Sequence, residues 1–211
     1  MQGRSYWLIL LVVSPALLTL IIGTWQSALL LIFGVAAAIG SAIVENGIFH
    51  TVEEYGFALS AGGKAFFLFA LPEELFKYFA TTSVAGNSAS GRTLVKSAVV
   101  VAIGFAIAEN CIYVIGFANN MTESMASVTT LLRLFLPFSM HLVCAPILMC
   151  GHVIRNFKPI GGIFLAIMLH GIYDTLSLGN TVVAVKLSYL VIILSSLFAG
   201  IVYRQTGVEK R

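Results

Sequence analysis

The chain has 211 residues, of which 59% are hydrophobic and only 10% are charged, and its mean hydropathy is +0.97. Soluble domains carry about 25% charged residues, so this composition excludes an ordinary soluble domain and predicts a polytopic membrane protein. The formal net charge is only +3 and no basic stripe is visible, so we expect the lipid bilayer as surroundings and no nucleic-acid partner. No soluble segment is left over, and residues 1–211 are expected to form a single integral-membrane domain.

Long apolar runs predict an all-α bundle of about seven transmembrane helices, because a membrane-spanning helix needs about 20 mainly apolar residues. The sequence between these runs is short and polar, and its longest stretch covers residues 49–63. The predicted spans lie at about 6–24, 27–48, 64–84, 94–118, 128–153, 160–179 and 183–203.

Lys and Arg are divided unevenly between the two sides of this predicted bundle. Cytoplasmic loops carry an excess of these residues, and one side collects seven of them against three on the other. This asymmetry predicts a cytoplasmic carboxyl terminus, an amino terminus outside the cell membrane, and an exterior position for the segment that holds Glu45, Glu53 and Glu54. The seven are Arg92, Lys96, Arg155, Lys158, Arg204, Lys210 and Arg211, and the three are Arg4, Lys64 and Lys186.

Ionisable residues lie deep inside four of the predicted spans. A charged side chain at the centre of a bilayer costs about 2.5–3.5 kcal/mol on insertion scales, so such residues are functional candidates by default. Their distances from the span ends place them at one depth, which predicts that they meet in one site. These residues are Glu73, Glu74 and Lys77 in the third span, Glu109 in the fourth, His141 in the fifth, and His170 and Asp174 in the sixth.

The spacing of these residues predicts which side chains share a helix face. Glu73 and Lys77 are four residues apart, which suits an ion pair. His170 and Asp174 are also four apart, so the Asp174 carboxylate is expected to orient the imidazole. Pro72 should kink the third span just before the Glu pair.

Two further polar residues have a simpler interpretation. Asn110, next to Glu109, is expected to form a hydrogen bond between helices. Arg133 lies near the end of its span, and its side chain is expected to reach the membrane surface.

This set of side chains permits hydrolysis of a peptide bond. Desolvation disfavours the charged form of a carboxyl, which makes Glu73 or Glu74 a candidate general base for an attacking water. Glu109, His141 and His170 form the ligand set of an open catalytic metal site, for which zinc is our expectation. Without a metal, the same three residues would hold the water and the oxyanion.

Four motifs follow one another along the chain: Glu73-Glu74-x-x-Lys77, Phe105-x-x-x-Glu109-Asn110, an isolated His141, and His170-x-x-x-Asp174. In this order they resemble the PrsW family of intramembrane proteases. The resemblance covers about residues 64–180 and implies cleavage of single-span membrane proteins, with anti-sigma factors as the known substrates. In the wider superfamily of CAAX prenyl endopeptidases and bacteriocin-immunity proteins the second motif ends in His, and Glu109 at that position favours the PrsW branch.

Two other classes of protein stay open at this point. Intramembrane Glu, His and Asp also form the proton relays of transporters, although the inverted repeats common in transporters are not visible in this sequence. A non-catalytic membrane binding or immunity protein would not need converging His and Glu residues.

Overall fold

Helices make up all the secondary structure in the part of the chain that the computed structural model describes, which confirms the predicted all-α class. The described residues are 25–56, 59–86, 89–120, 123–154, 157–178 and 181–207. The elements are α2 (Trp25–Glu54), α3 (Ala61–Gly63), η1 (Lys64–Ala70), α4 (Leu71–Ala85), α5 (Gly91–Asn120), α6 (Glu123–Leu148), α7 (Cys150–Val153), α8 (Pro159–Leu178) and α9 (Val182–Gln205).

Five helices of the described residues are long and apolar enough to cross a membrane, so the predicted number of about seven spans is not confirmed. The predicted span 6–24 lies outside the described residues. The predicted span 64–84 lies within a helical run, but α3, η1 and α4 divide that run into short pieces. The five candidate spans are Trp25–Glu54, Gly91–Ile115, Phe135–Val153, Pro159–Leu178 and Val182–Gln205.

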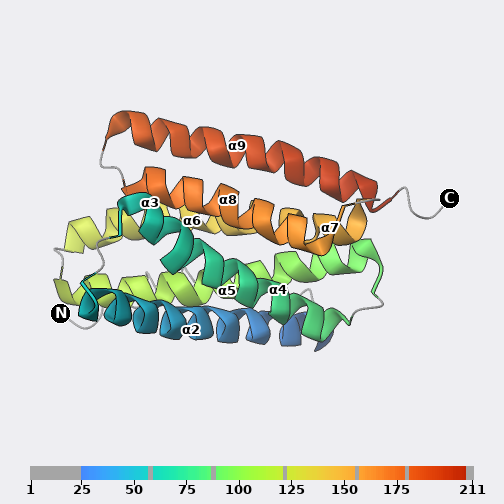
Figure 1. Ribbon diagram of the computed structural model, residues 1–211, viewed down its shortest axis with the longest axis horizontal. Coiled ribbons are helices and arrows are strands. Elements are labelled where there is room, and N and C mark those ends of the chain that lie inside the picture. Colours follow the sequence, from blue (N-terminus) through green and yellow to red (C-terminus); the bar gives the residue numbers. More distant parts are fainter. Residues whose placement is uncertain are drawn as a thin grey trace.

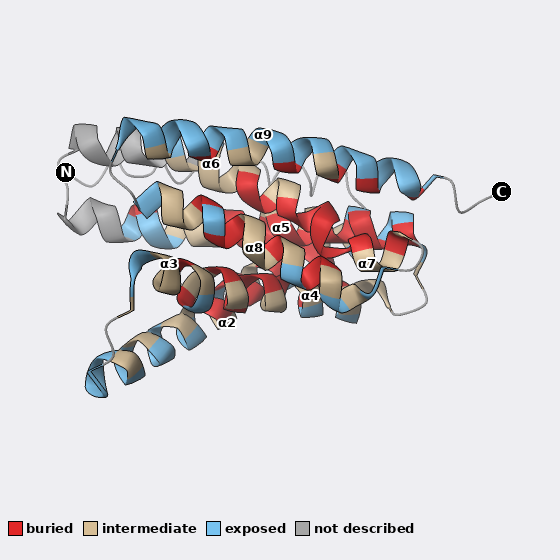
Figure 2. Ribbon diagram, turned by 45° about the horizontal axis from the view of Figure 1, so that its top comes forward, coloured by how far each residue is buried: buried red, intermediate tan, exposed pale blue. Residues whose placement is uncertain are grey.

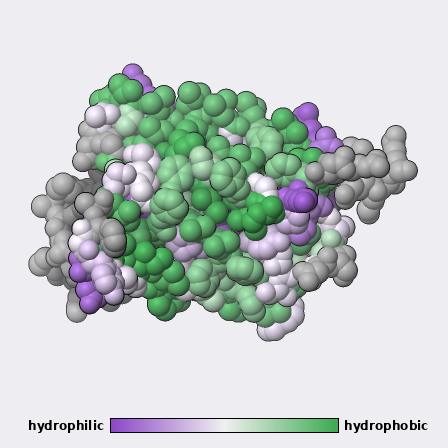
Figure 3. Space-filling view, viewed as in Figure 1, coloured by the Kyte–Doolittle hydropathy of each residue, from purple (hydrophilic) through white to green (hydrophobic). Residues whose placement is uncertain are grey.

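The helices lie side by side along the long axis of the molecule, with α9 at one edge and α2 at the other (Figure 1). α6 packs against α5, α8 and α9, whereas α2 packs against α4 and α5. Buried residues concentrate on the helices between the two edges, and α9 is largely exposed (Figure 2). Exposed hydrophobic side chains cover the middle of the face in Figure 3, with hydrophilic residues toward both ends. A hydrophobic surface of this kind suits contact with lipid. Helices can lie in lipid because each helix satisfies its own backbone hydrogen bonds.

Two glycines allow α2 and α5 to approach closely. A Cβ atom added at Gly34 would overlap the backbone carbonyl of Val101, and one added at Gly104 would overlap that of Leu31. Small residues at such crossings permit backbone contact between membrane helices. The crossing therefore fixes α5 next to α2, and Glu109 lies just over one turn beyond Gly104 on the same helix.

A π-helical segment leads into the Glu pair. The backbone N–H of Leu71 donates to the carbonyl of Phe66, five residues earlier. Pro72 follows, and proline has no N–H to donate and crowds the carbonyl four residues before it. The local distortion expected at Pro72 thus takes the form of a wide helical turn, a feature frequent at functional sites. It places Glu73 and Glu74 in the first turn of α4, where both are buried.

Candidate metal centre

The first two turns of α4 carry three charged side chains into the core. Glu73, Glu74 and Lys77 are 6%, 0% and 3% exposed. Lys77 Nζ lies 2.6 Å from Glu74 Oε1 and 3.7 Å from Glu73 Oε2, so the lysine expected to pair with Glu73 is closer to Glu74. One lysine faces two carboxylates, and Oε2 of each carboxylate has no hydrogen-bond partner among the described residues.

His141 of α6 and His170 of α8 face each other across the core, with ring centroids 5.1 Å apart. His170 Nδ1 lies 2.8 Å from Glu74 Oε1, and His141 Nε2 lies 2.6 Å from Glu109 Oε2. Four helices therefore contribute to one cluster, which confirms the predicted convergence of Glu74, Glu109, His141 and His170. Each imidazole is held by a carboxylate through one of its two ring nitrogens.

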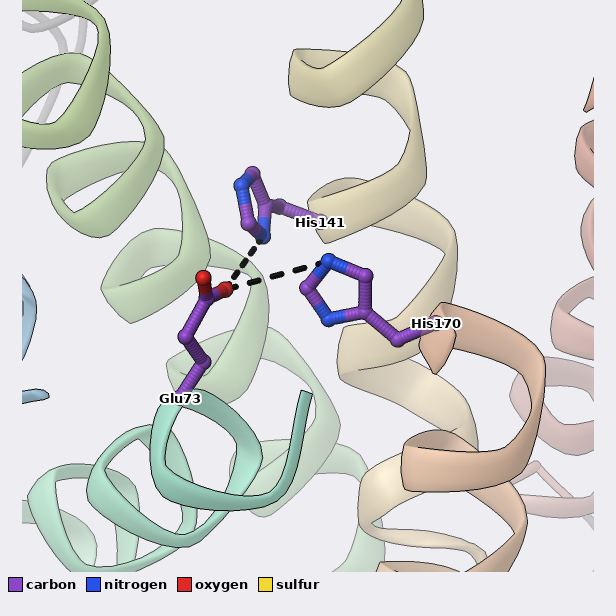
Figure 4. A group of neighbouring side chains, drawn as sticks. All are labelled: Glu73, His141 and His170. Carbon is purple, nitrogen blue, oxygen red and sulfur yellow. Dashed lines mark ion pairs between the residues drawn. The ribbon is translucent and has the colours of Figure 1, made fainter. Parts of the chain in front are cut away.

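The other ring nitrogens face Glu73. Its Oε2 lies 3.9 Å from His141 Nδ1 and 3.8 Å from His170 Nε2, as the dashed lines in Figure 4 show. One ligand atom from each of the three side chains lies within 4.8 Å of the other two. Two imidazoles and one carboxylate form the protein ligand set of an open catalytic zinc site.

The donor atoms fit a cation. Glu73 Oε2 is buried without a hydrogen bond, and the Lys77 ammonium lies 3.7 Å away. A buried polar oxygen that lacks a hydrogen bond is costly. A cation between this oxygen and the two imidazoles would remove that cost. Lys77 Nζ also lies 3.0 Å from His141 Nδ1; if a metal took that nitrogen lone pair, Lys77 would keep its ion pair with Glu74.

Two predicted site residues, Glu109 and Asp174, lie beside the group formed by Glu73, His141 and His170 and are not part of it. Glu109 contacts His141 on the side of the ring away from Glu73, so the atoms that converge on the two imidazoles belong to Glu73 and not to Glu109. Asp174 Oδ2 lies 3.7 Å from His170 Nε2, which is too long for a hydrogen bond. Glu74 is the carboxylate that hydrogen-bonds His170.

Arg133 belongs to the cluster, although the sequence suggested a side chain that reaches the membrane surface. Its Nη2 donates to Glu109 Oε1 at 2.6 Å, and its Nε donates to Asn110 Oδ1 at 3.2 Å. Asn110 thus forms the hydrogen bond between helices that was expected of it. The Arg133 guanidinium lies 3.5 Å from the centroid of the Tyr113 ring. The helical spacing of 133, 137 and 141 places Arg133, Pro137 and His141 on one face of α6, and that signal could have identified Arg133.

The phenylalanine of the second motif forms a wall of the same cluster. The Phe105 ring centroid lies 4.4 Å from Lys77 Nζ and 5.2 Å from the centroid of His141. A cation above an aromatic face is favourable, so Phe105 supports the Lys77 ammonium where water is excluded. Because 105 and 109 are four residues apart, Phe105 and Glu109 face the cluster together.

Two cavities meet at this cluster and share the side chains of Phe69, Glu73, Glu109 and Tyr113. The first, of about 240 Å³, is the histidine cavity, and its other lining residues are Arg133, Pro137, His141, His170, Tyr173, Asp174, Ser177 and Leu178. The second, of about 300 Å³, is the α2 cavity, and its other lining residues are Ala38, Ser41, Ala42, Glu45, Asn46, Phe49, Leu68, Phe105 and Ile112.

Glu45 is a second polar residue whose place in the site the sequence interpretation missed. The charge asymmetry predicts an exterior position for Glu45, within the predicted span 27–48; in the structure Glu45 lies on α2 and lines the α2 cavity. Residues 38, 41, 42 and 45 share one helix face, and this periodicity was the available signal.

The buried carboxylates and imidazoles form one cluster inside a bundle of apolar helices, an arrangement that an intramembrane hydrolase or a proton-relay transporter could use. A model of the PrsW family of intramembrane metalloproteases matches residues 23–201, most of the chain. The chain therefore belongs to the PrsW family, and it is a multi-pass membrane peptidase of a metal-dependent class. No curated protein and no solved structure matches it. Family membership favours the peptidase over the transporter and immunity-protein alternatives.

Proposed function

We propose that this protein hydrolyses peptide bonds of single-span membrane proteins, using a divalent cation held by Glu73, His141 and His170. The observation that carries the proposal is Glu73 Oε2, which has no hydrogen bond and lies 3.8–3.9 Å from one nitrogen of each imidazole. We propose zinc as the cation, because two neutral imidazoles and a carboxylate are its usual catalytic ligands.

Two carboxylates set the protonation of the imidazoles in this proposal. Glu109 accepts the Nε2–H of His141, and Glu74 accepts the Nδ1–H of His170. These hydrogen bonds leave a lone pair on His141 Nδ1 and one on His170 Nε2, both facing Glu73. Partners of this kind fix the tautomer and orientation of metal-binding histidines.

The bound cation would polarise the peptide carbonyl and make water a better nucleophile at neutral pH. Asp174 is our candidate for the base that takes the proton of the attacking water. It lines the histidine cavity with a side chain that is 20% exposed, and its Oδ2 lies 3.7 Å from His170 Nε2. Glu74, the other candidate base, is fully buried and lines neither of the two cavities, which favours a positioning role.

Arg133 is our candidate for stabilising the negative charge on the carbonyl oxygen. Its guanidinium lines the histidine cavity and is already anchored by Glu109 and Asn110. Fixed donors aimed at developing charge cost little reorganisation during the reaction.

Elemental analysis of protein purified without chelators tests this proposal, together with cleavage of a single-span reporter protein. We expect about one divalent ion per chain, lost in Glu73→Gln, His141→Ala and His170→Ala. Glu53→Gln, an exposed residue on α2, is the control and should keep both metal and activity. If metal-free protein still cleaves the reporter and a chelator has no effect, the metal-dependent mechanism is wrong. The same residues would then hold the attacking water and the oxyanion directly.

We also propose that the carboxyl terminus is cytoplasmic and the amino terminus outside. Support comes from the excess of Lys and Arg on one side of the bundle. The family resemblance further suggests that the substrates are membrane proteins of the anti-sigma-factor type.

A further inference from the structure

The α2 cavity lies on the opposite side of Glu73 and Glu109 from the two histidines. Only Phe69, Glu73, Glu109 and Tyr113 line both cavities, so these side chains form the partition between them. A peptide whose carbonyl group lies in the histidine cavity would therefore place a neighbouring group beside the α2 cavity. At about 300 Å³ the α2 cavity is at the lower end of the range of small-ligand pockets.

The lining of the α2 cavity is acidic. It contains three carboxylates and no Lys, Arg or His side chain. Glu109 is compensated by its contacts of 2.6 Å with both Arg133 and His141, and Glu73 lies 3.7 Å from Lys77. Glu45 forms no ion pair within the part of the chain that the structure describes, so a cation in the cavity would meet its carboxylate.

Glu45 differs from the other two carboxylates of the lining, because it takes no part in the cluster around the histidines. Neither Glu45 Oε1 nor Glu73 Oε2 has a hydrogen-bond partner among the described residues. Buried polar atoms are nearly always paired, so each exception calls for an explanation. Glu73 Oε2 faces the two histidines, so a cationic donor in the α2 cavity would pair with the Glu45 carboxylate.

Aromatic side chains complete the walls. Phe49, Phe69, Phe105 and Tyr113 line the cavity, and aromatic faces attract Lys and Arg. One face at the edge is already used in this way, because Lys64 Nζ lies 5.7 Å from the centroid of Phe49. Carboxylates combined with aromatic walls suit a side chain that has an apolar stem and a cationic head.

We propose that the α2 cavity is a substrate subsite that accepts a Lys or Arg side chain next to the scissile peptide bond, with Glu45 as the residue that selects it. This inference rests on the proposed function, because the same Glu73 forms both the wall of the subsite and the candidate metal centre. Glu45 is the specificity residue since it lies outside the histidine cavity and contacts neither histidine in the structure.

A binding experiment tests the subsite without requiring cleavage. The probes are N-acetyl-arginine amide and N-acetyl-citrulline amide, which have nearly the same shape but differ in charge, titrated into purified protein by calorimetry. We expect the arginine probe to bind at least about tenfold more tightly to the parent chain, as a charge-assisted hydrogen bond predicts. In Glu45→Gln the ratio should fall to near one, whereas Glu53→Gln, the same change on an exposed part of α2, should keep it. Equal binding of the probes, no binding of either, or a ratio unchanged in Glu45→Gln would overturn the proposal.

A cleavage experiment distinguishes failure of the subsite from failure of the proposed function. Single-span peptides with Lys, Arg, Gln or Leu at each position around the cut are digested, and the products are sequenced. The parent should prefer Lys or Arg at one flanking position. Glu45→Gln should lose that preference but still cleave the Gln and Leu peptides. Cleavage without such a preference contradicts the subsite alone. If the parent cleaves none of the peptides, the proposed function is contradicted and the titrations still decide the subsite.

Discussion

At Glu73, one carboxylate oxygen from α4 faces imidazoles from α6 and α8. The carboxylates around it have different surroundings: Glu74 is paired with Lys77, Glu109 with Arg133, and Glu73 Oε2 has no hydrogen bond. Different surroundings imply different roles, and substitutions that remove one carboxylate at a time can separate them.

Glu73→Gln and Glu74→Gln should each reduce cleavage sharply while leaving expression nearly unchanged, because removal of a buried charge lowers the cost of membrane insertion. Metal content should separate the two. Glu73→Gln removes a candidate ligand and should lose the ion, whereas Glu74→Gln keeps a carbonyl acceptor for His170 and should retain it. Reporter cleavage and elemental analysis of the same preparations measure both effects, and parent-like cleavage by both variants would refute the roles given to this pair.

Glu109→Ala should weaken metal binding about 10–100-fold, as loss of a carboxylate behind a metal-bound histidine usually does. The expected cause is the lost hydrogen bond of 2.6 Å to His141 Nε2. Asp174→Asn should abolish cleavage but keep metal affinity near that of the parent, because Asp174 is proposed as a base and not as a support for His170. Competition with a metal-binding dye measures both affinities. An effect of Asp174→Asn on affinity as large as that of Glu109→Ala would instead favour the orienting role.

At the scale of helices, the position of Glu109 depends on the crossing of α2 and α5. Gly34 and Gly104 face the opposite backbone there, whereas Gly47 on α2 has no atom within 4 Å of an added Cβ. The three glycines are all helical, so an alanine substitution has the same effect on backbone entropy in each case. Any difference in stability between the three alanine variants therefore reports the effect of the added methyl group on the contact between α2 and α5.

Gly34→Ala and Gly104→Ala should each destabilise the protein by about 1–3 kcal/mol, the usual cost of overpacking. Gly47→Ala should be neutral or slightly stabilising. Thermal unfolding in a single detergent measures all three, and equal stability of the three variants would show that the crossing tolerates a methyl group.

At the scale of the whole molecule, the charge asymmetry of the chain predicts its orientation in the membrane. Gly3→Cys and Gly207→Cys, each in a background without Cys111, Cys144 and Cys150, can be labelled with a membrane-impermeant thiol reagent. We expect labelling at position 3 in intact cells and at position 207 only after lysis, because the Lys- and Arg-rich side stays inside. Labelling of position 207 in intact cells would reverse the orientation.

The sequence by itself determined the class of the molecule. Apolar runs of span length indicate membrane helices whatever their neighbours, and an ionisable residue at bilayer depth is costly enough to indicate function without a structure. The convergence of Glu74, Glu109, His141 and His170 followed from their similar depth, and the structure confirms it.

Only the tertiary structure decided which atoms face one another. Periodicity shows which residues share a face of a helix, but it does not show how far each helix is rotated toward its neighbours. The wide turn before Pro72 and the glycine crossing of α2 and α5 set those rotations. For this reason Glu73, and not Glu109, faces the two imidazoles, Arg133 joins the cluster, and Glu45 lines a cavity that local sequence does not specify.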